Sequence, residues 1–253
     1  SAEDVELVGR RYGPANRLGL AAQIALMRHP GFGLQPEIGL PDVILQYLAA
    51  QLFVDPSSFS AYGQRAQTRT DHADLVARYL GIRPFRRGDL ALALNLAAQA
   101  AEYTDRGEPI VRALMVGLKG ERFILPSGDT LERAGLAGRA RARKAAAAAI
   151  VEGLSSAGLT RLDELVINNP DFGMTPLAWL RNFEEAPTAA NINGLLERLR
   201  YVRGIGIHPV VGGAIPEFRF AQFVREGGVA PAFLLSDYSV NRRRATLTAA
   251  VID

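Results

Sequence analysis

Apolar residues recur at intervals of three and four along most of the chain, which is the spacing of one buried helix face. The pattern predicts helices over residues 5–11, 14–28, 41–53, 56–62, 68–80, 90–103, 109–118, 139–154, 160–167, 188–203, 216–225 and 236–251, and one that starts at Pro176. Residues 82–89 are expected to be a linker, and residues 122–135 to include a short extended piece. Only "IGIHPVVGG", residues 205–213, is rich in β-branched residues. We therefore predict an all-α fold class of tandem helical bundles.

Residues that favour helix ends support these boundaries. Asp55 is followed by Pro56, which suits the first position of a helix, and Thr175 is followed in the same way by Pro176. Gly81 comes directly after the predicted helix 68–80, where a left-handed residue commonly ends a helix.

Composition limits the class of protein. The chain has 253 residues, of which 48% are hydrophobic and 22% charged, as in globular proteins of one to three domains. No apolar run is long enough to cross a membrane, and the first residues do not resemble a signal peptide. The sequence contains no cysteine, which excludes disulfides and thiolate metal sites. We expect a cytoplasmic protein without a membrane partner.

The basic residues are almost all arginine. Lys119 and Lys144 are the only lysines among the 29 basic residues, and arginine is the better ligand for phosphates and base edges. A GC-rich genome would explain the arginine content equally well. Local clustering is more informative, because residues 65–87 carry six arginines against two aspartates and residues 133–144 carry five basic residues and no acid. Such clusters favour a polyanionic partner.

Motifs of enzymes are missing from the sequence. It has no GxGxxG, GxxxxGK[ST], HExxH or GxSxG motif. His29, His72 and His208 lack metal-ligand spacing and are expected at the surface or at helix ends. Asp163 and Glu164 diverge on a helix and are expected on a solvated face. We therefore predict no catalytic residue, no metal site and no cofactor.

Residues 41–80 have the layout of a helix-turn-helix unit, with 68–80 as its recognition helix. Thr70, Asp71, Asp74 and Arg78 share the polar arc of that helix, and Asp74 is expected to pair with Arg78. Because exposed aspartates repel phosphates, the helix should enter a DNA groove by its N-terminal end. The residues expected to contact DNA there are Gln64, Arg65, Thr68, Arg69 and Thr70. A plain helical bundle with a charged rim is the alternative.

Three further clusters could contact phosphates. In the first, the body of the helix 14–28 is expected in the core although it includes polar Gln23, and only its N-terminal end is expected to be exposed, so that the cations there form a phosphate clamp. The second lies in the predicted linker. In the third, residues 139–144, Arg139 and Arg143 share a helix face that is either solvated or bound to phosphate. The run "NRRRA" at residues 241–245 is equally ambiguous, and Trp179 is expected in the core. The candidate residues of the three clusters are Arg10, Arg11, Asn16 and Arg17, then Arg86 and Arg87, then Arg139, Arg143 and Lys144.

With these pieces placed, the sequence resembles the N-terminal region of the Tn-three family of replicative transposases. The resemblance rests on "RRYGPANRLGLAAQIALMRHPG", "YLAAQLFVDPSSFSAY", "QTRTDHADLVARYLGIRPF", "TDRGEPIVRALMVGLKGERFILPSGDTLERAGLAGRARARK" and "GMTPLAWLRNFEEAPTAANINGLLERLRYVRGIGI". It departs from the family at Pro14–Ala15, where an acidic residue with a basic residue or histidine is usual, and in lacking a cysteine in the following helix.

The resemblance implies binding of a transposon's terminal inverted repeats by tandem centromere-protein-B-like helix-turn-helix units. Cutting and joining in this family belong to a C-terminal RNase H-like domain that binds Mg²⁺, so the resemblance implies that this chain alone is not an enzyme. It also implies a bacterial cytoplasm, with the protein on the nucleoid when bound, and possible self-association through the full-length protein.

Together these observations predict sequence-specific binding of double-stranded DNA at transposon ends. The expected units are 1–84, with the helix-turn-helix, then 88–155 as a second DNA-binding unit, and 156–253, which binds DNA or docks on the catalytic body. The alternative function is a helical protein-interaction scaffold without intrinsic DNA specificity.

Overall fold

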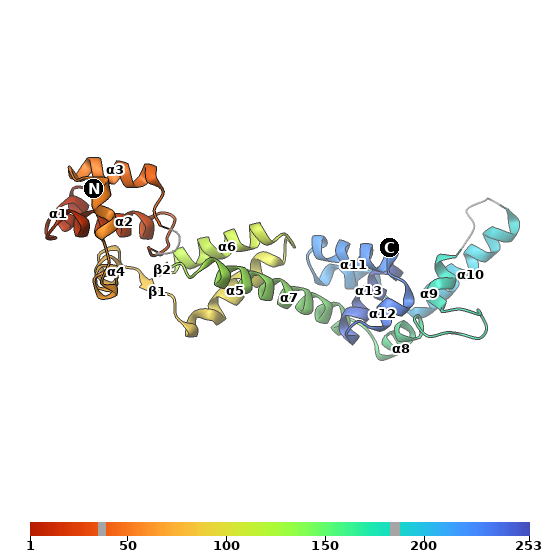
Figure 1. The fold of residues 1–253 in the computed structure, drawn as a ribbon. Coiled ribbons are helices and arrows are strands. Elements are labelled where there is room, and N and C mark those ends of the chain that lie inside the picture. Colours follow the sequence, from red (N-terminus) through yellow and green to blue (C-terminus); the bar gives the residue numbers. More distant parts are fainter. Residues whose placement is uncertain (35–38, 183–187) are drawn as a thin grey trace. The chain divides into compact units, whose positions relative to one another are not determined.

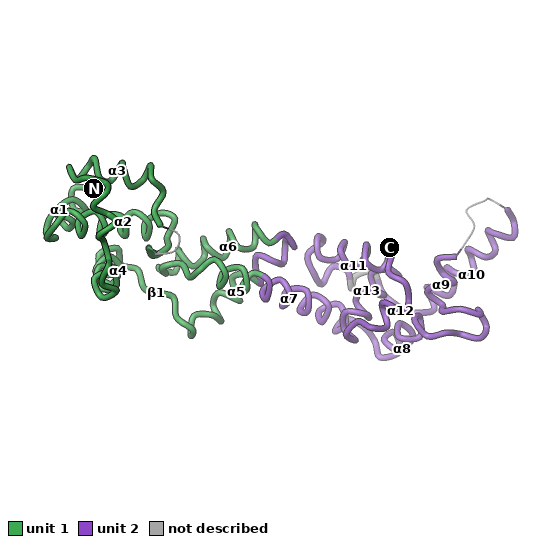
Figure 2. Tube along the Cα trace, in the orientation of Figure 1, with its two compact units in different colours: residues 1–97, 107–135 green, residues 98–106, 136–253 purple. Residues whose placement is uncertain are grey.

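The computed structural model describes residues 1–34, 39–182 and 188–253, and these residues are mostly helical (Figure 1). They form two compact units, coloured separately in Figure 2. Unit 1 comprises residues 1–97 and 107–135, and unit 2 comprises residues 98–106 and 136–253. The predicted predominance of helix is confirmed. The division into 1–84, 88–155 and 156–253 stays a prediction.

The first part of unit 1 is built around one buried helix. Helix α2 (Pro14–Arg28) contacts α1 (Ala2–Gly9), α3 (Asp42–Leu52), α4 (Ala66–Leu80) and the 3₁₀ helix η1 (Pro56–Ala61). Every residue from Leu18 to Ile24 is buried, and Val8 of α1 and Val76 of α4 pack against this segment. The burial predicted for the body of this helix is confirmed.

The rest of unit 1 contains η2 (Arg87–Asp89), part of α5 (Leu90–Ala101), α6 (Gly107–Gly120) and the start of α7 (Gly128–Glu152). Strand β1 (Arg83–Pro84) pairs in parallel with β2 (Phe123–Ile124), so the predicted linker joins the predicted extended piece. The Arg83 guanidinium lies 3.7 Å from the centroid of the Phe123 ring. This contact adds a cation–π interaction to the strand pairing.

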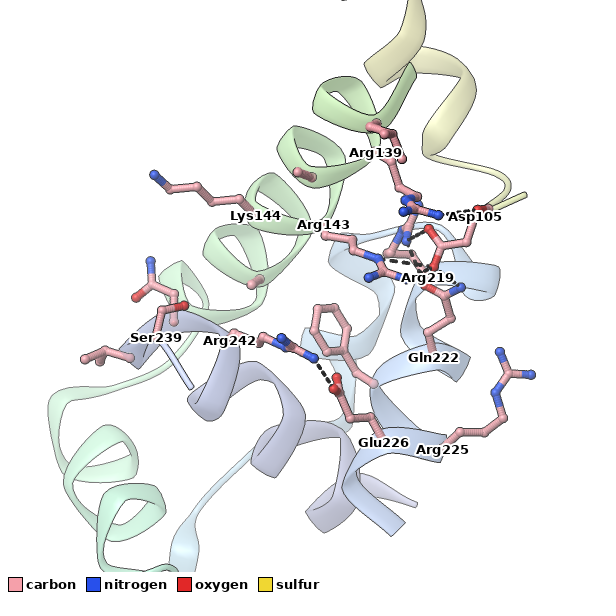
Figure 3. Close-up of a pocket in the computed structure, with 16 residues that line it drawn as sticks. Asp105, Arg139, Arg143, Lys144, Arg219, Gln222, Arg225, Glu226, Ser239 and Arg242 are labelled. Carbon is pink, nitrogen blue, oxygen red and sulfur yellow. Dashed lines mark hydrogen bonds and ion pairs between the residues drawn. The ribbon is translucent and has the colours of Figure 1, made fainter. Parts of the chain in front are cut away.

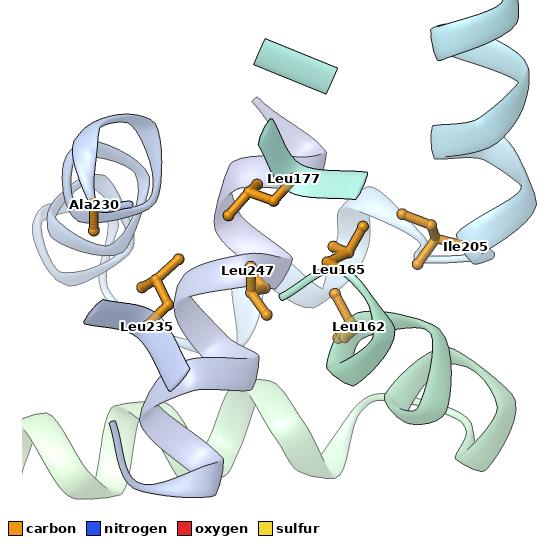
Figure 4. Packing of buried hydrophobic residues seen from close by; sticks show 7 residues of the cluster. All are labelled: Leu162, Leu165, Leu177, Ile205, Ala230, Leu235 and Leu247. Atoms are coloured by element: carbon orange, nitrogen blue, oxygen red, sulfur yellow. The ribbon is translucent and has the colours of Figure 1, made fainter. Parts of the chain in front are cut away.

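Unit 2 contains the remainder of α5 and α7, followed by shorter helices. These are α8 (Ser156–Glu164), α9 (Pro176–Arg181), α10 (Ala189–Ile205), the 3₁₀ helix η3 (Pro209–Ala214), α11 (Glu217–Val229), α12 (Ala232–Ser236) and α13 (Val240–Ile252). Figure 4 shows one buried cluster, in which Leu162, Leu235 and Leu247 are inaccessible to solvent. Helices α11 and α13 approach closely, since a Cβ at Gly227 would lie 2.7 Å from the Thr246 carbonyl oxygen.

Several predicted boundaries need correction. The strand-like stretch 205–213 is no strand: Gly206 has φ +75° and ends α10 in the left-handed conformation, and the 3₁₀ helix η3 follows. The helix predicted over 139–154 starts earlier, at Gly128, because Leu131 and Ala134 are buried in the core and their packing outweighs the low helix propensity of Gly135 and Gly138. The last predicted helix, 236–251, is α13, which starts later, at Val240 with Ser239 as its N-cap, and the short helix α12 before it was not predicted.

Helix α3 forms where its pattern predicts, but much of its apolar surface faces solvent. Val43 is 78% exposed, Tyr47 62% and Phe53, at its C-cap, 96%. Ala49 is the buried residue of this helix, and Leu48 and Leu52 pack at the edge of the unit 1 core. The spacing therefore predicts the helix correctly without predicting its environment.

Candidate nucleic-acid interface

Helix α4 presents the polar arc that its sequence predicts. Thr70, Asp71, Asp74 and Arg78 are exposed, while Val76 is buried and Leu75 packs at the edge of the core. Gly81 ends the helix with φ +64°, as predicted. The expected pairing of Asp74 with Arg78 is not formed, since the ion pairs of residues 1–34, 39–182 and 188–253 do not include it. Both side chains are exposed, where such a pair gains little.

The N-terminal end of α4 is held by a buried polar network. Gln23 Nε2 donates to the Arg69 carbonyl oxygen at 3.0 Å and to Tyr62 Oη at 2.9 Å. Tyr62 Oη lies 3.0 Å from His72 Nδ1, and the two rings stack with centroids 5.6 Å apart. The backbone of the predicted recognition helix is therefore tied to α2 at its first turn.

One residue of this network, His72, was expected at the surface or at a helix end, and that expectation is wrong. Gln23 is 2% exposed and His72 is 7% exposed. Burial lowers the pKa of His72, and the charge of Arg11 lowers it further, against an opposing effect of Asp71. His72 is therefore neutral at pH 7, and its Nδ1 can then accept a hydrogen bond from the Tyr62 hydroxyl. Burial also raises the pKa of Tyr62.

The predicted contact residues at this end differ in exposure. Gln64, Arg65 and Thr70 are exposed, and Thr68 and Arg69 are half-buried. The stem of Arg69 crosses the turn before the helix, since a Cβ at Gly63 would lie 2.3 Å from Arg69 Cγ. Gly63 has φ +68°, so this turn needs glycine for its conformation and for the space that Arg69 fills.

The cations at the start of α2 are close in sequence but differ in their contacts. Exposed Arg10 forms an ion pair with Glu6 at 2.5 Å, and exposed Arg17 donates through Nε to the Arg11 carbonyl oxygen at 3.0 Å. Asn16 Nδ2 donates to the Tyr12 carbonyl oxygen at 3.0 Å. Arg11 is half-buried, and its Nε has no partner among the described residues. No side chain caps α2, whose N-cap is Gly13.

The predicted linker carries two exposed cations. Arg86 and Arg87 both face solvent at η2, and the Arg86 N–H donates to Asp89 Oδ2 at 2.8 Å. Asp89 also accepts from Arg83 Nη1 at 3.1 Å. These bonds order the backbone here while the side chains of Arg86 and Arg87 stay available to a ligand.

In unit 2, Arg139 and Arg143 meet at Asp105. Arg139 Nη1 donates to the Asp105 carbonyl oxygen at 3.2 Å, and Arg143 Nε donates to Asp105 Oδ2 at 3.2 Å. Lys144 is exposed beside them. Figure 3 shows these residues around a cavity of about 900 Å³.

The cavity includes functional candidates that sequence reasoning missed. Arg219 is 1% exposed, and its Nη1 donates to Asp105 Oδ1 at 2.6 Å and to Gln222 Oε1 at 2.7 Å. Burial disfavours ionisation of Asp105, but the hydrogen bonds from Arg143 and Arg219 outweigh it and lower its pKa to about 2. A signal was present in the sequence, since Arg219 lies one helical turn from Phe223 on the buried face of α11.

The run "NRRRA" is engaged inside unit 2. Arg242 pairs with Glu226, Arg243 lies 3.1 Å from Asp163 Oδ1, and Arg244 lies 2.6 Å from Asp163 Oδ2. Its arginines therefore serve packing of α13 against its neighbours. Asp163, expected on a solvated face, is partly buried by these contacts.

Trp179 is half-buried in an aromatic cluster. Its ring stacks on Phe172 at a centroid distance of 4.5 Å and meets Tyr201 edge-on at 5.6 Å. Arg198 lies 4.7 Å from its centroid. Trp179 was expected in the core and is instead only half-buried.

The described part of the chain contains neither a group of metal ligands nor a membrane-spanning helix. No three histidine, cysteine, aspartate or glutamate side chains are grouped there as metal ligands. Within the same residues, no helix has the length and apolar character to cross a membrane.

The chain is similar to known transposases. A family model described as "Domain of unknown function (DUF4158)" matches residues 1–137. The transposase for transposon Tn501 of Pseudomonas aeruginosa is 33% identical over 250 residues, which cover 99% of this chain and 25% of that protein. The transposase for transposon Tn21 of Escherichia coli is 32% identical over 247 residues, with 97% and 25% covered. The chain thus spans about a quarter of the length of these relatives.

Proposed function

The chain belongs to the DUF4158 family and matches the N-terminal quarter of Tn-three family transposases, and from this premise we propose that it binds double-stranded DNA at the terminal inverted repeats of a transposon. The observation that carries the proposal is the first turn of α4, which is exposed at its outer side and tied to α2 by Gln23. A rigid mount for a few exposed polar side chains is what reading of base edges requires.

In this proposal α3, η1 and α4 act as a helix-turn-helix unit of the centromere-protein-B-like type. Exposed Asp71 and Asp74 lie along the outer face of α4 and would repel the phosphates of a groove occupied lengthwise. The helix therefore enters by its N-terminal end. Thr68, Arg69 and Thr70 face the bases, and Gln64 and Arg65 reach the backbone.

The other cationic clusters contact phosphates and supply affinity without sequence preference. The exposed members are Arg10, Arg17, Arg86, Arg87, Arg143 and Lys144, with Arg11, Asn16 and Arg139 beside them. We assign these contacts to successive units at 1–84 and 88–155. Residues 156–253 bind DNA or dock on the remainder of the transposase.

The proposal concerns binding rather than cutting. We assign strand cleavage and joining, with the Mg²⁺ that they need, to the parts of the family's transposases outside the matched quarter, and no cofactor to this chain. Binding takes place on the bacterial nucleoid in the cytoplasm, and self-association involves the full-length protein.

The test is a gel-shift titration of residues 1–253 on two duplexes. One carries the terminal inverted repeat that flanks the chain's own gene, and the other carries the same bases scrambled. We expect the repeat to bind more tightly, with a difference that persists across a salt series, because base contacts depend on salt less than phosphate contacts do. Equal affinity for both duplexes at every salt concentration contradicts the proposal.

A second candidate function is a protein-interaction scaffold, and α10 favours it. Ile192, Leu195, Leu196 and Leu199 recur at helical spacing and are between 43% and 52% exposed. Such a row is a typical docking face for another helix. Light scattering separates the candidates, because a stable oligomer that shows no DNA affinity supports the scaffold.

A further inference from the structure

The cavity of unit 2 carries an excess of positive charge. Helices α7, α11 and α13 and residue 105 line it (Figure 3). Its basic lining residues are Arg139, Arg143, Lys144, Arg219, Arg225 and Arg242, and its acidic ones are Asp105 and Glu226. The two carboxylates cannot neutralise six cations, so the cavity attracts anions.

The carboxylates are already engaged. Asp105 accepts from Arg143, from Arg219 and, at 2.6 Å, from Gln222 Nε2, while Glu226 accepts from Arg242. Three cations of the lining remain without a carboxylate in the described part of the chain: Arg139, which meets only a backbone carbonyl, and exposed Lys144 and Arg225.

The inner cluster is also short of acceptors. Arg219 donates to Asp105, to Gln222 and to the Ala101 carbonyl oxygen, yet its Nε is buried with no partner among the residues described. A buried donor without an acceptor is unfavourable, so this nitrogen favours an added acceptor. A single carboxylate shared by two guanidinium groups leaves this cluster cationic, and Arg219 is fixed in place by burial.

The cations are spread rather than focused on one point. Figure 3 shows Arg139, Arg143 and Arg219 together near Asp105, with Lys144 and Arg225 on opposite sides of them. The lining also includes apolar side chains, among them Leu136, Ala147 and Phe223. Separated cations in a partly apolar cavity suit a ligand with several phosphates linked by sugars, more than one compact anion.

We infer that this cavity binds the phosphodiester backbone of a nucleic acid duplex, with Lys144 and Arg225 contacting separate phosphates and the Arg219–Asp105 cluster holding the cavity wall. The ligand and the role of Lys144 rest on the proposed DNA binding, whereas the roles of Arg219 and Arg225 do not, since α11 plays no part in the end recognition argued for α4. The cavity would thus add sequence-independent affinity.

The test uses the full chain and removes the two exposed cations of the lining that pair with no carboxylate in the described part of the chain. Lys144→Gln with Arg225→Gln should weaken binding to the inverted-repeat duplex and to the scrambled duplex equally, on the order of tenfold at physiological salt, and should reduce the salt slope by about 2. The matched control is Arg200→Gln with Arg203→Gln, which removes the same charge from exposed positions of α10 outside the cavity. It should change affinity much less.

The outcomes separate the two proposals. If the cavity variant binds both duplexes as the α10 control does, the inference is overturned, whether or not the wild-type chain prefers the repeat. If the variant is weakened on both duplexes while the wild-type chain shows no preference, the inference stands and end recognition fails.

A competition experiment distinguishes a backbone from a free nucleotide. Thymidine 5′-monophosphate and inorganic pyrophosphate are added to the chain bound to scrambled duplex. An extended site predicts that neither displaces the duplex at concentrations below about 1 mM, since each offers too few of the required contacts. Displacement by the mononucleotide in the micromolar range, lost in the Lys144→Gln and Arg225→Gln variant, would contradict a backbone site.

Discussion

At the scale of single residues, the packing around Gly19 leaves no room for a side chain. A Cβ there would lie 2.1 Å from Cδ2 of the Tyr62 ring, and the ring is itself held by Gln23 and His72. We predict that Gly19→Ala lowers the free energy of unfolding of unit 1 by about 1–3 kcal/mol, since the added methyl overpacks a fixed aromatic ring.

The matched control for this substitution is Gly9→Ala. Gly9 is also helical, in α1 of the same unit, and a Cβ there meets no atom within 4 Å. Alanine is the better helix former, so this variant should be neutral or slightly stabilised. Trp179, the single tryptophan, lies in unit 2, so hydrogen exchange of the α2 and α4 amides is the suitable measurement. Equal protection in the two variants would contradict the packing account.

The neutral state of His72 makes unit 1 sensitive to pH. Its pKa in the folded chain lies below the ordinary value of 6.5, so the unfolded chain binds more protons below that pH. The contribution of His72 to the free energy of unfolding is therefore fully present above pH 6.5. It is lost as the pH falls below 6.5 toward the pKa of His72 in the folded chain. We predict that the free energy of unfolding of unit 1 decreases as the pH falls below 6.5, visible as faster exchange of the α2 and α4 amides.

His72→Gln isolates this effect. Glutamine can still bond to Tyr62 Oη but does not titrate in this range. The variant can be less stable at every pH, but the difference between pH 7.5 and 5.5 should shrink relative to wild type. An unchanged difference would assign the pH dependence to other groups.

At the scale of elements, local sequence is enough to predict most helices. It does not predict the features that depend on contacts between distant parts of the chain. The ends of α4 and η1 follow from Gly81 and Asp55, which act within a few residues. The stretch 205–213 has β-branched residues, but its first residues end α10 and its last ones lie in η3. No strand of the described chain pairs with it. The exposure of Val43 in α3 likewise cannot be predicted from the spacing of apolar residues in that helix.

The sequence likewise predicts one part of the candidate site and not the other. The polar arc of α4 is predictable, since it depends on helix geometry alone. The cavity of unit 2 is not, because Arg219 and Asp105 are 114 residues apart in sequence. The buried network of Gln23 and His72 also joins separate elements, and polar residues are expected at the surface unless their partners are known.

Helix α4 leads to a prediction about sequence preference. If Arg69 reads a base, Arg69→Ala should weaken binding to the inverted repeat by about 1–3 kcal/mol and bring it closer to the affinity for scrambled duplex. Arg78→Ala is the control, because Arg78 is exposed on the same helix three turns away from the proposed entry point at Thr68. A loss of equal size on both duplexes would reassign Arg69 to a phosphate.

At the scale of the whole molecule, the two compact units carry different proposed tasks. The network around Gln23 orders one end of α4 in unit 1, and the cluster around Asp105 orders the cavity in unit 2. The two sets of side chains share no hydrogen-bond partner. Their contributions to the free energy of binding should therefore be nearly independent.

This independence gives the final prediction, which concerns a combined variant. Arg69→Ala should reduce preference for the repeat, and Lys144→Gln with Arg225→Gln should reduce affinity for both duplexes. In the triple variant the two losses in binding free energy should add to within about 0.5 kcal/mol, as measured by titration of both duplexes at one salt concentration. A larger deviation would mean that the units act on DNA as one coupled surface, because loss of contacts in one would then alter the contacts made by the other.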